Sequence, residues 1–157
     1  RMIGMPLFIP AGTYDRVALN TTVAGTSIWR IGIYPNDPAT NKPDGQTLLL
    51  DCGSIDTSAT AGTLTSTISL TITTSGVYWI GVLCDSYTSA PTCTAWIGNT
   101  GQTPHTPFLG GFGSAGPGGR GGFLRYKAGV ATGSIPATYP TSTTKSDIGP
   151  QILLRKT

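Results

Sequence analysis

Residues 75–85 constrain the fold more than any other part of the chain. They form an apolar run of strand length, rich in β-branched and aromatic residues and flanked by turn formers. With the two-residue period of a strand, one face carries Val77, Trp79, Gly81 and Leu83, and the other carries Tyr78, Ile80, Val82 and Cys84. Neither face is polar, whereas a strand in an antiparallel sheet with one solvated side carries polar residues on that side. We therefore expect a central strand whose second cover is either loops of the same chain or another copy of it.

Residues 64–73 show the cleanest alternation, with aliphatic side chains on one face and Thr or Ser on the other. This pattern predicts a strand with one core face and one solvated face. The turn at residues 74–76 predicts an antiparallel hairpin into the apolar strand. Further strands are predicted at residues 2–9, 14–23, 27–34, 47–55, 93–97, 123–127 and 151–155.

Short strands at this spacing predict an all-β fold, an antiparallel β-sandwich of jelly-roll-like or Greek-key type. The 22 Gly and 12 Pro, with many Thr and no Glu, leave few good helix formers, so we expect essentially no helix. The 157 residues suit a single domain over residues 1–157, with a long Gly/Pro/Thr-rich loop at 98–150 before a closing strand. Because the chain opens without an initiator Met, we expect it to be the C-terminal part of a longer chain.

Charge and motif content argue against several functional classes. The basic residues are scattered and the net charge is only +3, so nucleic-acid binding is not indicated. No apolar run is long enough for membrane insertion. The glycine pattern at residues 111–116 resembles a dinucleotide fingerprint, but the Pro-Gly-Gly that follows cannot start the helix that such a site needs.

Catalysis is not expected either. His105 is the only histidine, and it lies between two prolines with no nucleophile elbow nearby. The seven acidic residues are all Asp and lie in turns or at strand ends. One His and three dispersed Cys give no zinc-ligand spacing, so we predict no enzyme, no cofactor and no metal site.

The loop holding Asn36, Asp37, Asn41 and Asp44 could bind calcium through oxygen ligands. The alternative is a set of Asx turns, in which these side chains hydrogen-bond to nearby backbone, and we favour it.

Three cysteines, Cys52, Cys84 and Cys93, cannot all pair within one chain. Cys84 and Cys93 could close the loop between them by a disulfide. We favour three reduced, largely buried thiols.

Four segments taken in order, residues 9–16, 29–34, 50–56 and 76–81, resemble the distal β-sandwich domain of tailed-bacteriophage tail fibres and receptor-binding tail proteins. The resemblance covers roughly the first hundred residues. It implies a virion component that, as a homotrimer joined to other tail proteins, attaches to a glycan or outer-membrane protein on the host surface. It also implies that variable loops do the binding, without catalysis, and that the domain is extracellular when it acts.

The resemblance transfers no binding residue, so the contact candidates come from composition alone. Trp29 and Trp79 lie mid-strand and are expected in the core, whereas Trp96 borders the long loop. Aromatic and Arg side chains on loops suit glycan or protein recognition. The receptor-binding candidates are Trp96, His105, Phe112, Arg120, Arg125 and Tyr126.

A trimer would also cover the second face of the apolar strand, and we favour this cover over the chain folding back. The predicted interface is Tyr78, Ile80 and Val82. Two alternatives stay open for the function. One is a structural tail, baseplate or capsid-decoration domain, and the other is a carbohydrate-binding module of a depolymerase.

Overall fold

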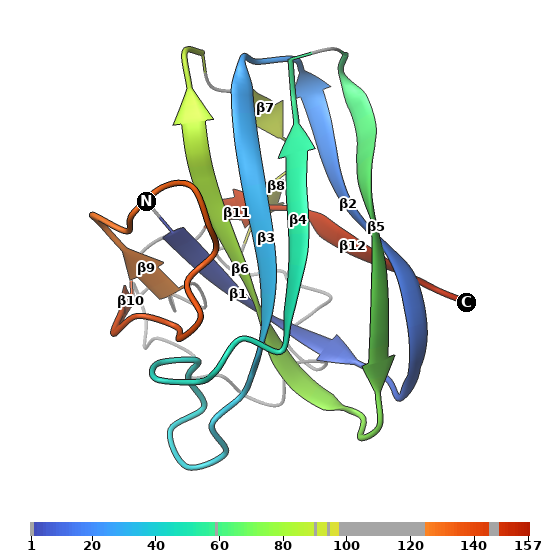
Figure 1. Ribbon diagram of the computed structural model, residues 1–157, viewed down its shortest axis with the longest axis vertical. Coiled ribbons are helices and arrows are strands. Elements are labelled where there is room, and N and C mark those ends of the chain that lie inside the picture. Colours follow the sequence, from blue (N-terminus) through green and yellow to red (C-terminus); the bar gives the residue numbers. More distant parts are fainter. Residues whose placement is uncertain (1, 59, 90, 94, 98–124, 145–147) are drawn as a thin grey trace.

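A computed structural model describes residues 2–58, 60–89, 91–93, 95–97, 125–144 and 148–157. All the regular secondary structure in these residues is β-strand (Figure 1). The strands are β1 Met2–Ile9, β2 Gly12–Val23, β3 Ser27–Pro35, β4 Leu50–Asp56, β5 Gly62–Ile72, β6 Gly76–Tyr87, β7 Thr92–Cys93, β8 Ala95–Ile97, β9 Arg125–Lys127, β10 Thr143–Thr144, β11 Ile148–Pro150 and β12 Ile152–Lys156. Within the described part of the chain, no helix is long and apolar enough to span a membrane.

Two antiparallel sheets pack face to face, which confirms the predicted β-sandwich. The larger has the strand order β10-β9-β1-β6-β3-β4. The smaller has the order β12-β2-β5, and β7 also pairs with β2. A separate pair joins β8 to β11. The predicted closing strand is confirmed as β12, and the strand predicted at residues 123–127 corresponds to β9. The region predicted as loop also contains β10 and β11.

The apolar strand β6 is central, as predicted, since β1 lies on one side of it and β3 on the other. The predicted hairpin between β5 and β6 is wrong, because β5 pairs with β2 and β6 pairs with β1 and β3. The turn instead carries the chain from one sheet to the other, at the end where β1 also passes into β2 (Figure 1). Ser75 Oγ accepts a hydrogen bond of 2.8 Å from Ala11 N and so links the two crossings.

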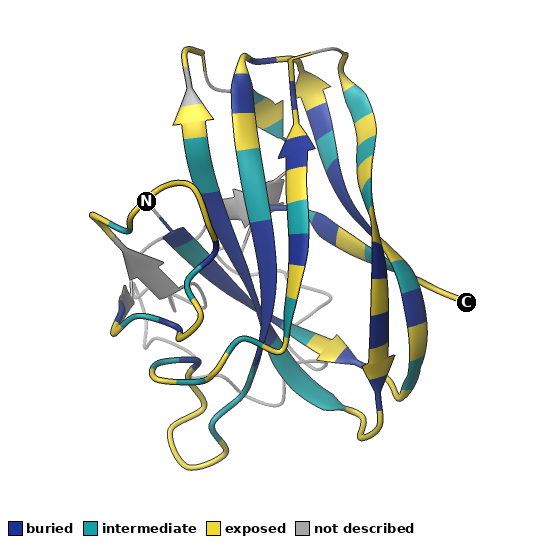
Figure 2. Ribbon diagram, viewed as in Figure 1, coloured by how far each residue is buried: buried dark blue, intermediate teal, exposed yellow. Residues whose placement is uncertain are grey.

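The sandwich core lies between the inner faces of the two sheets. The alternation predicted for β5 is confirmed: its aliphatic side chains face this core, and its Thr side chains are exposed (Figure 2). The predicted partner-facing residues of β6 belong to the same core. Ile80 and Val82 are each only 1% exposed, and Tyr78 is half-buried against them. The predicted oligomer interface is therefore wrong, since its side chains are used to fold the single chain.

The outer face of β6 is covered by a second cluster, made by the chain itself. Residues 128–142, here called the arm, run from β9 to β10 and lie over the outer face of the larger sheet. The outer-face cluster consists of Met2, Tyr34, Trp79, Leu83, Ile135 and Tyr139. Trp79 is thus buried, as predicted, and the second cover is the folded-back chain rather than a partner.

Candidate binding region

The predicted contact residues divide between two sheets. Arg125 and Tyr126 are neighbours in β9, which pairs with β1 on one side and β10 on the other. Trp96 lies in β8, where its partner residue is Gly149 of β11. The other three candidates, His105, Phe112 and Arg120, lie outside the described residues. Arg125 and Tyr126 are close only because they are consecutive in the sequence, and Trp96 lies in a different sheet.

Both described flanks of the predicted binding loop belong to paired strands. The loop follows β8, which β11 holds, and it precedes β9, which β1 and β10 hold. A loop whose ends are fixed on a rigid sheet is the usual location of binding residues in β-sandwich folds. Residues 98–124, which would carry the contacts, lie outside the described part of the chain.

The arm after β9 is attached to the connection between β3 and β4. Tyr139 N donates to Gln46 O at 2.8 Å, and Gly45 N donates to Tyr139 O at 2.9 Å. Leu48 N donates to Ala137 O at 2.8 Å. These backbone bonds make a short antiparallel ladder outside the main sheets, so the arm is held along its length as well as at its ends.

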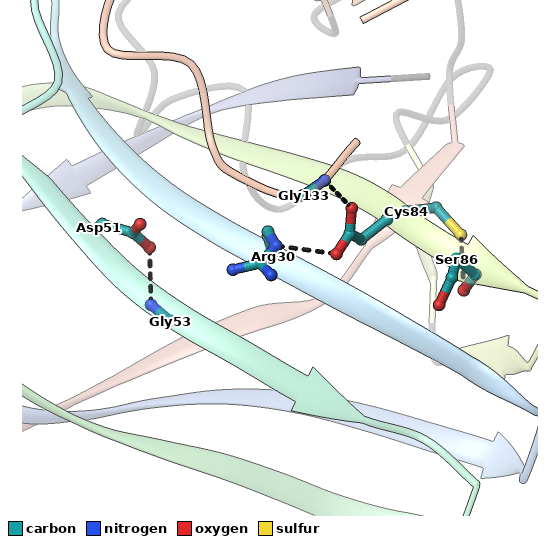
Figure 3. A network of polar contacts seen from close by, with 7 residues as sticks. Arg30, Asp51, Gly53, Cys84, Ser86 and Gly133 are labelled. Atoms are coloured by element: carbon teal, nitrogen blue, oxygen red, sulfur yellow. Dashed lines mark hydrogen bonds and ion pairs between the residues drawn. The ribbon is translucent and has the colours of Figure 1, made fainter. Parts of the chain in front are cut away.

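Asp85 makes a further link between the arm and the larger sheet. Its Oδ2 accepts a hydrogen bond of 2.9 Å from Arg30 Nε, and its Oδ1 accepts one from Gly133 N of the arm. In Figure 3 the contacts from Arg30 and from Gly133 meet at this carboxylate. The Asp85 side chain is 11% exposed and that of Arg30 is 26% exposed. The Gly133 amide first, and then the Arg30 guanidinium, hold the pKa of Asp85 below its ordinary value.

This lowered pKa predicts an acid dependence of stability. A carboxylate with a depressed pKa stabilises the folded state above its unfolded-state pKa, and this contribution is lost as the pH falls through the folded-state pKa. Asp85→Asn should therefore lower the free energy of unfolding by about 1–3 kcal/mol at about pH 6, and by less at about pH 3. Urea unfolding at the two pH values measures both differences. Asp56→Asn is the comparison variant. The pKa of Asp56 is also lowered, first by the Ser58 side chain and then by Ser58 N at 2.8 Å, but these partners lie two residues away and join no separate segments of the chain. An equal acid dependence in the two variants would contradict the assignment.

Three glycines form a row across the centre of the outer face. In the strand register Gly81 of β6 is opposite Gly4 of β1 on one side and Gly32 of β3 on the other. A Cβ on Gly4 would overlap the phenol oxygen of Tyr139. The row is thus a shallow trough that receives side chains of the outer-face cluster.

The other two glycines accommodate different side chains of the same cluster. A Cβ on Gly32 would lie 2.7 Å from Ile135 Cγ1, and one on Gly81 would lie 2.8 Å from Tyr34 Cε2. The sequence interpretation missed this trough. In the sequence, the trough is indicated only by one glycine in each of three apolar strands, at Gly4, Gly32 and Gly81.

Hydrogen bonds show how Asp37, in the loop that could bind calcium, is used. Asp37 accepts from Ala39 N at 2.9 Å and from Thr40 Oγ1 at 2.7 Å, which confirms an Asx turn at this residue. Asn36 Oδ1 instead accepts from Trp79 Nε1 at 2.8 Å. The described residues contain no cluster of three or more His, Cys or acidic side chains arranged for a metal ion.

None of the three cysteines, all of them in the described residues, is in a disulfide, in agreement with the preferred prediction. Cys52 is buried, and Cys84 and Cys93 are half-buried. Burial raises the pKa of Cys52 to about 12. This thiol is therefore protonated and unreactive at neutral pH.

Comparison with protein-family models, with curated proteins and with solved structures finds no match to the chain. The class that the structure defines is an all-β sandwich in which the strands on both sides of residues 98–124 are paired. Function is therefore proposed from the fold, the loop and the resemblance of the four segments.

Proposed function

We propose that this chain is the distal adhesion domain of a bacteriophage tail fibre, and that it binds a glycan or outer-membrane protein on the host surface without catalysis. The observation that carries the proposal is the pairing of both flanks of the long loop, β8 with β11 and β9 with β1. A sandwich supplies a rigid base, and a long loop on such a base can present Arg and aromatic side chains to a surface ligand.

Deletion of residues 110–122 should abolish adsorption of the purified domain to host cells while the sandwich stays folded. The reason is that the deletion removes candidate contacts but none of the described strands. We expect at least about a hundredfold loss of binding, the size of a lost interface hot spot. Binding to a panel of intact bacteria, measured by flow cytometry of labelled domain, gives this comparison.

A matched control replaces residues 38–41, an exposed loop between β3 and β4, with a Gly-Ser segment of equal length. This variant should adsorb like the parent. Circular dichroism and urea unfolding check that both variants are folded. Unchanged adsorption after the 110–122 deletion would contradict the loop assignment, and a parent that binds no bacterium would contradict the proposed function.

The proposal includes the homotrimer that the resemblance implies. The face predicted for it is occupied by the sandwich core, so a trimer would have to use other surfaces. Light scattering of the purified domain gives its mass in solution. A monomeric mass would contradict the trimer and leave the adhesion proposal to be tested by binding.

A further inference from the structure

We infer that Tyr139 is a positioning residue: seated on the glycine row, it fastens the arm and thereby holds β9, the strand at which the candidate binding loop rejoins the sheet. The consequence for receptor binding rests on the proposed function. The structural step, from Tyr139 to β9, can be tested without any receptor.

Strand β9 has little to hold it by itself. In the part of the chain that the structure describes, its backbone pairs with β1 at Met2, Ile3 and Gly4, and with β10 at two residues. So short a pairing, one strand in from the edge of the sheet, opens readily unless tertiary contacts support it. The arm is the direct continuation of β9 and ends at β10, so contacts of the arm restrain both strands.

Tyr139 is buried between the arm and the sheet. Its side chain is 1% exposed, and its ring meets the ring of Tyr34 edge to face, with 5.0 Å between the centroids and 89° between the planes. The hydroxyl of Tyr34 in turn donates to Pro136 O of the arm at 2.6 Å. Tyr34 thus contacts the arm at Pro136 as well as at Tyr139.

Gly4 both contacts the Tyr139 side chain and pairs with β9. Gly4 leaves the space that the Tyr139 phenol occupies, and the same Gly4 is the register partner of Arg125 in β9. Loss of the ring therefore removes support from β1 at the position where β9 is attached. The sandwich core lies on the other face of the sheet and has no buried residue in common with the outer-face cluster.

Limited trypsin digestion measures how often β9 detaches from the sheet, because trypsin cleaves after Arg125 and Lys127 and strand pairing protects both sites. In the full chain, Tyr139→Ala should speed cleavage after these two residues about tenfold or more, as expected for a local opening. Tyr139→Phe keeps the ring and should stay within about twofold of the parent. Mass spectrometry of the fragments over time gives the rate at each bond.

Leu70→Ala is the matched control, since Leu70 is a buried residue of β5 in the sandwich core. It should lower the stability of the whole domain without preferential cleavage in β9. Equal cleavage of the parent and Tyr139→Ala would overturn the inference. An equal acceleration of cleavage after Arg125 and Lys127 in Leu70→Ala would also overturn it.

Adsorption to intact cells of a strain that the parent binds provides the second readout. We expect Tyr139→Ala to lose about tenfold in binding and Tyr139→Phe to retain it. If cleavage rises while adsorption is unchanged, the positioning role at the receptor is overturned. A parent that fails to adsorb while the cleavage rates behave as expected would count against the proposed function and in favour of the structural step.

Discussion

A Val82→Lys variant should fail to fold, rather than dissociate an assembly of folded domains. Val82 is on the inner face of the central strand and is 1% exposed within the sandwich core. An ammonium group there would have no partner, and such burial costs several kcal/mol even after relaxation. That cost is comparable with the whole stability of a typical domain, about 5–15 kcal/mol. Far-UV circular dichroism and urea unfolding should show loss of the cooperative transition.

Thr71→Lys is the matched control, because Thr71 points from β5 into solvent. It should unfold within about 0.5 kcal/mol of the parent. A folded Val82→Lys domain with a smaller mass than the parent would restore the interpretation of this face as an interface between copies.

The position of β6 could be predicted from its sequence, and the identity of its second cover could not. Two apolar faces on one strand require burial on both sides, whatever the topology. The side chains that provide the outer cover, Ile135 and Tyr139, lie in a segment rich in Thr, Pro and Gly without strand or helix periodicity. Their contact with β6 depends on the arm folding across the sheet, which no local pattern specifies.

The error at the β5–β6 turn has a similar cause. The residues Thr74, Ser75 and Gly76 signal a reversal of the chain, and the reversal is present. Whether the returning strand pairs with its predecessor or enters the opposite sheet depends on which strands already occupy the neighbouring places. Here β5 pairs with β2, and β6 lies between β1 and β3, so the turn crosses between layers.

The candidate binding region was predictable in composition but not in geometry. Trp96 and Arg125 could be nominated as residues beside a Gly-rich loop, yet their division between two sheets follows from long-range pairing. The trough of Gly4, Gly32 and Gly81 depends on the same pairing, because only strand register places the three glycines in one row.

Gly81→Val should be strongly destabilising, although valine is a better strand former than glycine. A Cβ at Gly81 would overlap Met2 Cε and lie 2.8 Å from Tyr34 Cε2, and both side chains are fully buried. Overpacking of this kind costs typically about 1–3 kcal/mol, which exceeds the strand-propensity gain of at most about 1 kcal/mol. The midpoint of urea unfolding should therefore fall, and the fluorescence of the neighbouring Trp79 should change as the outer-face cluster loosens.

The same substitution at Gly76, in the same strand, tests whether the trough rather than glycine itself is responsible. Nothing lies within 4 Å of a Cβ built at Gly76, and its backbone is not in the left-handed region. Gly76→Val should consequently leave stability unchanged or raise it by up to about 1 kcal/mol. If the two valine variants unfold at the same urea concentration, the outer face is not packed against the glycine row. A loss confined to Gly81→Val would show that Met2 and Tyr34 of the outer-face cluster pack against the row of glycines, on the face of the sheet opposite the sandwich core.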